Sequence, residues 1–127
     1  MYHGPVPLLV VDQATIMCSM SQKPSKLVVL DPHRRGVGHQ RAATVADHVP
    51  MKNVQPFGPC MSPAFPPTAA AHAPQPCVPN TRSPWAPGSA VTMIGNHRAL
   101  VATDTCRCEW GGTISIVDPG QTLVSDT

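Results

Sequence analysis

Aromatic and charged side chains are both scarce in this sequence of 127 residues: aromatic residues make up 4% and charged residues 13%. Few large apolar side chains limit the core that one domain can bury. The net charge is only +2, which argues against intrinsic disorder, because disorder usually combines low hydrophobicity with high net charge. The sequence therefore predicts one compact domain that needs fastening beyond its hydrophobic core.

Long apolar runs are missing as well. None approaches the roughly 18 residues of a membrane span, and the early run at residues 8–11 (LLVV) is too short for a signal peptide and has no Lys or Arg before it. We expect a protein made in the cytosol, with no signal peptide and no stable membrane anchor. The Lys and Arg residues are scattered without interleaved aromatics, a poor footprint for nucleic acid, so no nucleic-acid partner is expected.

Catalytic signatures are also absent. Glu109 is the single glutamate, and no nucleophile elbow, phosphate-binding loop or dinucleotide fingerprint occurs. A cysteine and histidine acting as a nucleophilic pair stays open, but no local signature supports it. We expect a protein that is not an enzyme.

Proline is abundant, with 16 residues, and it excludes long helices because each interior proline removes a donor and clashes with the preceding turn. Most prolines lie in residues 50–88, which predicts extended coil laid over the core. Within it, residues 68–73 (TAAAHA) predict a helix of one or two turns, capped by Thr68 and stopped by Pro74.

The remaining pattern is typical of short β-strands, so the expected fold is mainly β, with short hairpins and long proline-rich loops. The first two apolar runs flank Asp12 and Gln13 and predict a hairpin, and residues 118–121 (DPGQ) predict a turn. Strands are expected at residues 8–11, 14–18, 26–30, 42–46, 91–94, 100–103 and 113–117.

Two stretches resemble each other. Residues 38–47 (GHQRAATVAD) and 95–104 (GNHRALVATD) both read glycine, two polar residues, Arg-Ala, and a β run closed by aspartate. Each follows a β run, at 26–30 and 91–94, so each pair predicts a hairpin turning at the glycine. This likeness indicates an internal duplication. The alternative is a chance similarity between two hairpins.

The cysteines number five, an odd count without a signal peptide, which favours free thiols or a metal over a disulfide framework. Four thiolates around one ion form the usual closed site of structural zinc, and such an ion contributes roughly 10–16 kcal/mol to the folding of small metal-binding domains. No CxxC pair is present. The alternative is that the cysteines are buried as small apolar side chains. His39 and His97 are second-choice ligands.

Four motifs carry a resemblance, in the order NVQPFGPCMSP (53–63), PCVPNTRSPWAPGS (76–89), GNHRAL (95–100) and CEWGGTISIVDPGQ (108–121). Together they resemble the PAAR-like family, also described as domain of unknown function 4280. The resemblance runs from about residue 8 to residue 121 and implies a single domain spanning 1–127 with a small cone-shaped fold. The chain departs from the family at Gln13, where relatives usually have glycine, and in the hairpin turns.

The resemblance implies a metal site. The family's four cysteines fall on Cys18, Cys60, Cys77 and Cys108, with Cys106 as the alternative to Cys108. The implied cofactor is one structural zinc ion, and iron stays possible. Cys108 is favoured because it stands in the Cys-x-Trp-Gly-Gly frame, so Trp110 and the glycines would shape the turn that places it.

The resemblance also implies a function. PAAR-like proteins cap the trimeric VgrG spike of type VI secretion and related contractile injection systems, sharpen it for membrane puncture, and help carry effectors. The expected partners are one spike trimer per chain and an effector protein. The chain would reside in the bacterial cytoplasm before firing and then be injected through the apparatus. The alternative is a small metal-binding interaction module or effector adaptor outside that apparatus.

Overall fold

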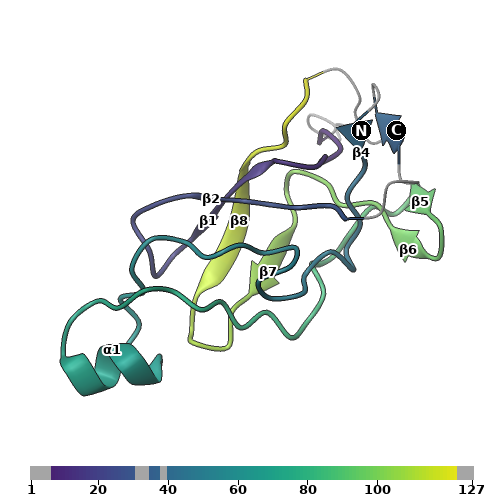
Figure 1. The fold of residues 1–127 in the computed structure, drawn as a ribbon. Coiled ribbons are helices and arrows are strands. Elements are labelled where there is room, and N and C mark those ends of the chain that lie inside the picture. The colour runs from purple at the N-terminus through teal and green to yellow at the C-terminus, as the bar shows by residue number, and fades with distance from the viewer. Residues whose placement is uncertain (1–6, 31–34, 38–39, 123–127) are drawn as a thin grey trace, which may run out of the picture.

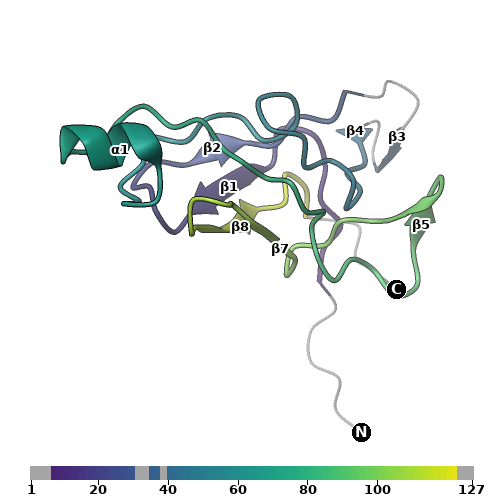
Figure 2. The ribbon, with the colours of Figure 1, turned by 90° about the horizontal axis from the view of Figure 1, so that it is seen from below.

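The chain folds into an elongated body with distinct ends. The computed structural model describes residues 7–30, 35–37 and 40–122. Two small hairpins lie at one end, and α1, the one helix among these residues, lies at the other, as Figures 1 and 2 both show. None of the described residues forms a helix long and apolar enough to cross a bilayer. The expected mainly β fold is confirmed.

A four-stranded antiparallel sheet forms the middle of the body. The predicted strand at 113–117 is present as β8, and β7 lies where no strand was predicted. Isoleucines of β8 alternate with exposed polar residues, so one face of the sheet packs on the core. In the spatial order β2-β1-β8-β7, the strands are Ser25–Lys26, Thr15–Cys18, Thr113–Asp118 and Thr105–Arg107.

Two hairpins lie outside this sheet. Strands β5 (Met93–Ile94) and β6 (His97–Arg98) pair about Gly95, whose φ is 62°, so this predicted hairpin is confirmed. Strands β3 (Arg35–Val37) and β4 (Gln40–Arg41) form the other, whose turn residues Gly38 and His39 lie outside the described residues.

Part of the predicted strand pairing is wrong. Residues 26–30 do not pair with 42–46: β2 pairs with β1, and Leu27 bridges Val54. Residues 8–11 do not form a hairpin with β1, although the chain does turn at residues 12–13. Gln13 has a φ of 70°, the left-handed conformation that favours glycine, at the position where relatives of the family were expected to have it.

Helix α1 (Pro66–Ala71) has the predicted short length but a different start. Phe65 precedes it with no side-chain cap, so the assignment of Thr68 as the cap is wrong. Thr68 lies inside the helix and donates its hydroxyl to the carbonyl of Cys60 at 2.6 Å. Thr68 is also the only buried residue of α1, so the helix itself contributes little to the core.

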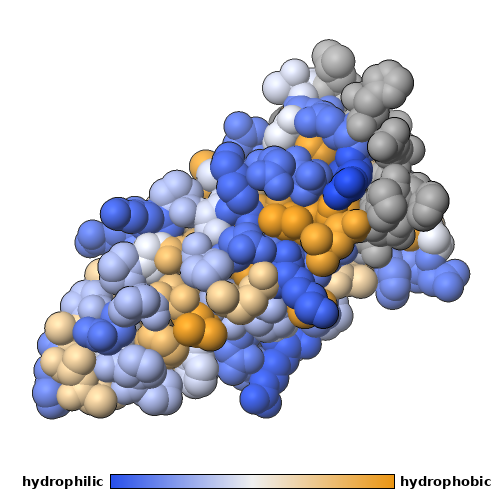
Figure 3. Space-filling model, in the orientation of Figure 1, coloured by the Kyte–Doolittle hydropathy of each residue, from blue (hydrophilic) through white to orange (hydrophobic). Residues whose placement is uncertain are grey.

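Buried apolar side chains form two clusters. The larger one joins the sheet to Trp85, Phe57 and Leu100, and it includes Cys106 and Cys108. The smaller one contains only Leu9, Val11, Ala42, Ala99 and Val101, with Ile94 packed against it. Figure 3 shows that, on the face drawn, the largest continuous hydrophobic area lies toward the hairpin end and not toward α1.

Candidate functional site

Three short segments, residues 9–11, 42–44 and 99–101, close into a ring of backbone hydrogen bonds. The N–H of Val10 donates to the carbonyl of Leu100 at 3.0 Å, and the N–H of Leu100 donates to Ala43 at 3.0 Å. Ala43 completes the cycle by donating to the carbonyl of Val10 at 2.9 Å. The middle residues of the three segments are Val10, Ala43 and Leu100. Each of them therefore donates a hydrogen bond to one of the other segments and accepts one from the other.

The ring follows a pseudo-threefold rule beyond its centre. In each segment the residue before the middle bridges the residue after the middle of another segment: Leu9 with Val101, Ala42 with Val11, Ala99 with Thr44. The residues two positions from the middle obey the same rule through N–H to carbonyl bonds: Asp12 to Arg41, Val45 to Arg98, Ala102 to Leu8. Three parts of one chain thus occupy nearly equivalent positions around one axis.

Aspartates close two of the three segments and explain the sequence repeat. The carboxylate of Asp47 accepts from the N–H of Thr44 at 2.8 Å, and that of Asp104 accepts from Val101 at 3.0 Å. The first segment has Ala14 at this position, and the N–H of Val11 donates instead to the carbonyl of Pro119 at 3.0 Å. The two-fold repeat in the sequence is therefore part of a threefold arrangement.

We expect Asp104→Ala to lower the free energy of unfolding by about 2–4 kcal/mol, because hydrogen bonds to a charged group contribute roughly 1.5–3 kcal/mol each. The buried carboxylate accepts from Val101 and from Gly88, at 3.0 and 3.1 Å. Urea unfolding measures the change. Thr103→Ala, an exposed neighbour in the same turn, is the control and should stay within about 0.5 kcal/mol. Equal losses in both variants would contradict the capping role.

The cysteines lie along the sheet and the long loop. Cys18 ends β1, and Cys108 follows β7 directly, so both are held by strands. Cys60 and Cys77 lie on the loop that contains α1, one before and one after the helix. Cys18, Cys60 and Cys108 are buried, and Cys77 is half-buried. The four predicted ligands therefore come from two parts of the structure.

These four thiols are electrostatic neighbours. Burial raises the pKa of Cys77, and the charges of Cys60, Cys108 and Cys18 raise it further, against a backbone hydrogen bond at Phe57 that lowers it. Burial likewise raises the pKa of Cys18, with smaller contributions from Cys108 and Cys60 and an opposing one from Met20. The raised pKa keeps Cys18 and Cys77 protonated unless a cation offsets the thiolate charge.

Cys106 stands apart from this group. Burial raises its pKa to about 12, and Cys108 is the one cysteine whose charge adds to the shift. Its Sγ donates to the carbonyl of Ser83 at 3.5 Å. The neighbourhood of the thiols therefore favours Cys108 over Cys106 as the fourth member.

The Cys-x-Trp-Gly-Gly motif is a tight turn that sets Cys108 beside Cys18. The N–H of Cys108 donates to Gly112, and the N–H of Gly111 donates to Cys108, both at 2.9 Å. Gly111 has a φ of 95°, which L side chains rarely adopt. A Cβ on Gly112 would lie 2.5 Å from the Sγ of Cys18 and 3.7 Å from the Cβ of Cys108. Each glycine is thus required for a different reason.

The donor set fits a thiolate-bound ion by its chemistry. Four cysteine sulfurs suit tetrahedral zinc. Within the described ranges, no group of three or more histidine, cysteine, aspartate or glutamate side chains is already arranged to hold a metal, so ligation requires the thiols to draw together. His97 is exposed on β6 in the hairpin end, away from the cluster, and His39 lies outside the described residues.

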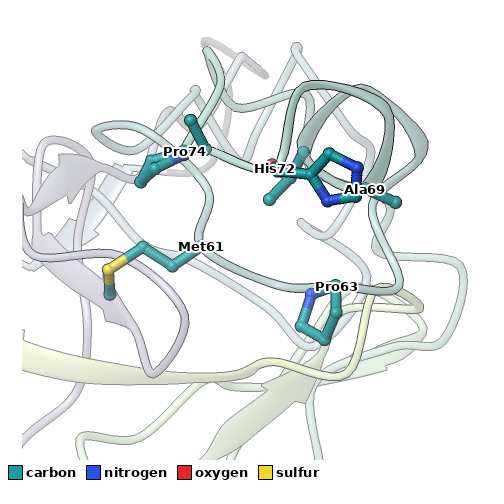
Figure 4. A pocket seen from close by; sticks show the side chains of 7 residues that line it. Met61, Pro63, Ala69, His72 and Pro74 are labelled. Carbon is teal, nitrogen blue, oxygen red and sulfur yellow. The ribbon is translucent and has the colours of Figure 1, made fainter.

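A groove of about 320 Å³ lies beside α1, outside the cysteine cluster (Figure 4). Proline, alanine and methionine side chains form most of its lining, and His72 is its one titratable side chain. The residues that sequence reasoning missed are those that support the cysteines, namely Gln75, Ser62 and Phe65. Ser62 stands in the motif at residues 53–63 without any sign of its role, and no motif contains Phe65 or Gln75.

Comparisons with known proteins give one match. Residues 10–121 match the family described as a domain of unknown function (DUF4280). No curated protein and no solved structure matches the chain. The match covers all of the ring except Leu9, together with all five cysteines and α1.

Proposed function

The chain belongs to the DUF4280 family, and we propose that it is the non-enzymatic tip of a contractile injection spike of the type VI secretion kind, seated on a trimeric VgrG-type spike protein. The pseudo-threefold ring of residues 9–11, 42–44 and 99–101 supports this proposal. The resemblance to PAAR-like proteins supplies the biological setting.

Symmetry is the physical reason why the ring supports a place on a trimeric spike. A trimer ends in three identical edges, and a single chain can satisfy all three only if it presents three nearly equivalent edges itself. The ring offers these, because its three segments exchange the same backbone hydrogen bonds in the same register. Residues next to the ring can then pair with the partner's strands by strand addition.

The two ends suit the proposed role. Hairpins β3–β4 and β5–β6 lead into the ring, and α1 lies at the opposite end (Figures 1 and 2). With the ring on the spike, the end with α1 points forward and remains free for an effector. One zinc ion bound by Cys18, Cys60, Cys77 and Cys108 would fasten that end, and iron is the alternative ion. The protein would then stay in the cytoplasm until it is fired through the apparatus.

Copurification with the cognate spike trimer tests the placement. The expected complex contains one chain per three spike subunits, measured by mass photometry or native mass spectrometry. A complex with three chains per trimer would contradict the use of internal symmetry. Absence of any complex with correctly folded protein would overturn the spike-tip proposal and favour an adaptor outside the apparatus.

We expect Met93→Glu to weaken spike binding by at least about tenfold, because a charge placed in an apolar contact is costly to desolvate. Met93 is 58% exposed on β5, next to the ring. The control is Met51→Glu, since Met51 is 49% exposed in the turn around residues 49–54, outside the ring and its hairpins. Affinity for the immobilised trimer gives the readout. Equal affinities of the two variants would remove the hairpin end from the interface.

A further inference from the structure

We propose that Trp110 is the positioning residue that brings the two loop cysteines to the two sheet cysteines, so that the metal site is assembled from two halves. This inference rests on the metal site of the proposed function. The sheet half contains Cys18 and Cys108, and the loop half contains Cys60 and Cys77.

The sheet half is held by the fold without the loop. Cys18 pairs with Ile114 in the β1–β8 register, and the turn that begins at Cys108 is closed by its own backbone hydrogen bonds. A Cβ built on Gly112 would lie 2.5 Å from the Sγ of Cys18 and 3.7 Å from the Cβ of Cys108, so both cysteines lie around one glycine. These two thiols therefore stay neighbours as long as the sheet is intact.

The loop half is closed on itself. The N–H of Cys60 donates to Gln75 at 2.7 Å, and the N–H of Gln75 donates back to Cys60 at 3.3 Å. Cys77 follows two residues later, and Thr68 of α1 donates to the carbonyl of Cys60. The two loop thiols are thus held together by local contacts, which do not by themselves fix the loop on the sheet.

Trp110 joins the halves at three points. Its ring contacts the ring of Phe65, with centroids 5.5 Å apart and planes tilted by 50°. Its indole N–H donates to the carbonyl of Val78 at 2.9 Å, beside Cys77. Its carbonyl accepts the hydroxyl of Ser62, two residues after Cys60. The indole and backbone of one residue therefore fix the loop next to both of its cysteines.

Few other contacts perform this task. Two backbone hydrogen bonds among the described residues also join the loop to the sheet: Met61 donates to Met20 and Glu109 donates to Asn80, each at 2.9 Å. Removing the indole leaves both of these bonds, the bond from Ser62 to the carbonyl of residue 110, the sheet half and the loop half in place. The expected result is a loop that samples positions away from Cys18 and Cys108, and an ion held by fewer thiolates.

Cobalt(II) titration of the full-length protein tests this, because the sulfur-to-cobalt charge-transfer absorption grows with the number of thiolate ligands. The proteins compared are wild type, Trp110→Ala, Trp110→Phe and Trp85→Phe. Supporting-residue changes typically weaken metal affinity 10–100-fold, and we expect this range for Trp110→Ala, with reduced charge-transfer intensity at saturation. Trp110→Phe keeps a ring for Phe65 and should lie between Trp110→Ala and wild type.

Trp85→Phe is the matched control. Trp85 also donates its indole N–H to a backbone carbonyl, that of Asp47 at 3.0 Å, but it is buried in the main core. We expect it to lower stability while cobalt affinity and spectrum stay at wild-type values. Wild-type affinity and spectrum in Trp110→Ala would overturn the role of Trp110 and leave the site intact. A wild-type protein that binds no cobalt would overturn the metal site and this inference together.

Discussion

Cys60→Ser is expected to abolish tight zinc binding and to lower the melting temperature by more than about 10 °C. A serine hydroxyl is not ionised near neutral pH and is a poor replacement for a thiolate ligand. Structural zinc contributes several kcal/mol or more to small domains, and about 2–8 °C of melting temperature corresponds to each kcal/mol in domains near this size. Thermal unfolding and elemental analysis of the same preparation measure both effects.

Cys106→Ser is the matched control. Cys106 is as buried as Cys60, but its Sγ donates to Ser83, and a serine hydroxyl can replace that donor. We expect one zinc per chain in this variant and a loss of about 1 kcal/mol of stability. The opposite pattern, with zinc lost from Cys106→Ser and kept in Cys60→Ser, would show that the ligand assignment is wrong. A wild-type protein with freely reactive thiols and no metal would remove the site altogether.

Sequence patterns predicted the strand at 113–117 and the hairpin about Gly95 because both are local. The first has β-branched residues at most positions, and the second has a glycine at the turn. The predicted hairpin at 8–18 is wrong because an apolar run does not determine which other segment it pairs with. Leu9 and Val11 pair with Val101 and Ala42, which lie far along the chain, and such pairings leave no local signal.

The ring shows the same limit at the level of the fold. The aspartates at 47 and 104 made two of its three segments look alike in sequence. The segment at residues 9–11 does not show the repeat in its sequence, because Ala14 stands where the other two segments have aspartate. The carbonyl of Pro119 takes over part of the role of that aspartate. Because a backbone carbonyl from a distant residue accepts this hydrogen bond in place of an aspartate, the threefold repeat is present in the structure but not in the sequence.

For the candidate site, the sequence named candidate ligands, whose binding of an ion stays a prediction, but it did not name all of the residues that support them. Cysteine is a distinctive residue, so five cysteines and a family resemblance were enough to name Cys18, Cys60, Cys77 and Cys108. Trp110 was predicted to shape a turn, and the structure adds its contacts with Phe65 and Val78. These contacts depend on where the loop lies on the sheet, which residue spacing does not encode.

Gly112→Ala is expected to lower zinc affinity at least about tenfold and stability by about 1–3 kcal/mol, the usual range for an added methyl group in a packed site. The new Cβ would lie 2.5 Å from the Sγ of Cys18, so the sulfur or the turn must move. Gly111→Ala is the comparison. It is strained by its φ of 95°, but its nearest neighbour is Ser62 at 3.8 Å, so we expect lower stability with one zinc per chain retained.

A double-mutant cycle with Cys18→Ala separates the steric effect from a general weakening of the turn. Without the Cys18 sulfur, the nearest remaining atoms to a Cβ at position 112 belong to Met20 and Cys108, at 3.5 and 3.7 Å, which are ordinary contacts. Gly112→Ala should then cost less than about 0.5 kcal/mol in the Cys18→Ala background, giving a coupling energy of about 0.5–3 kcal/mol between the two positions. Urea unfolding of the four proteins in chelator, so that no bound ion contributes, measures this coupling. Additive losses would mean that Gly112 is needed for the backbone of the turn alone, and that Cys18 does not lie over it.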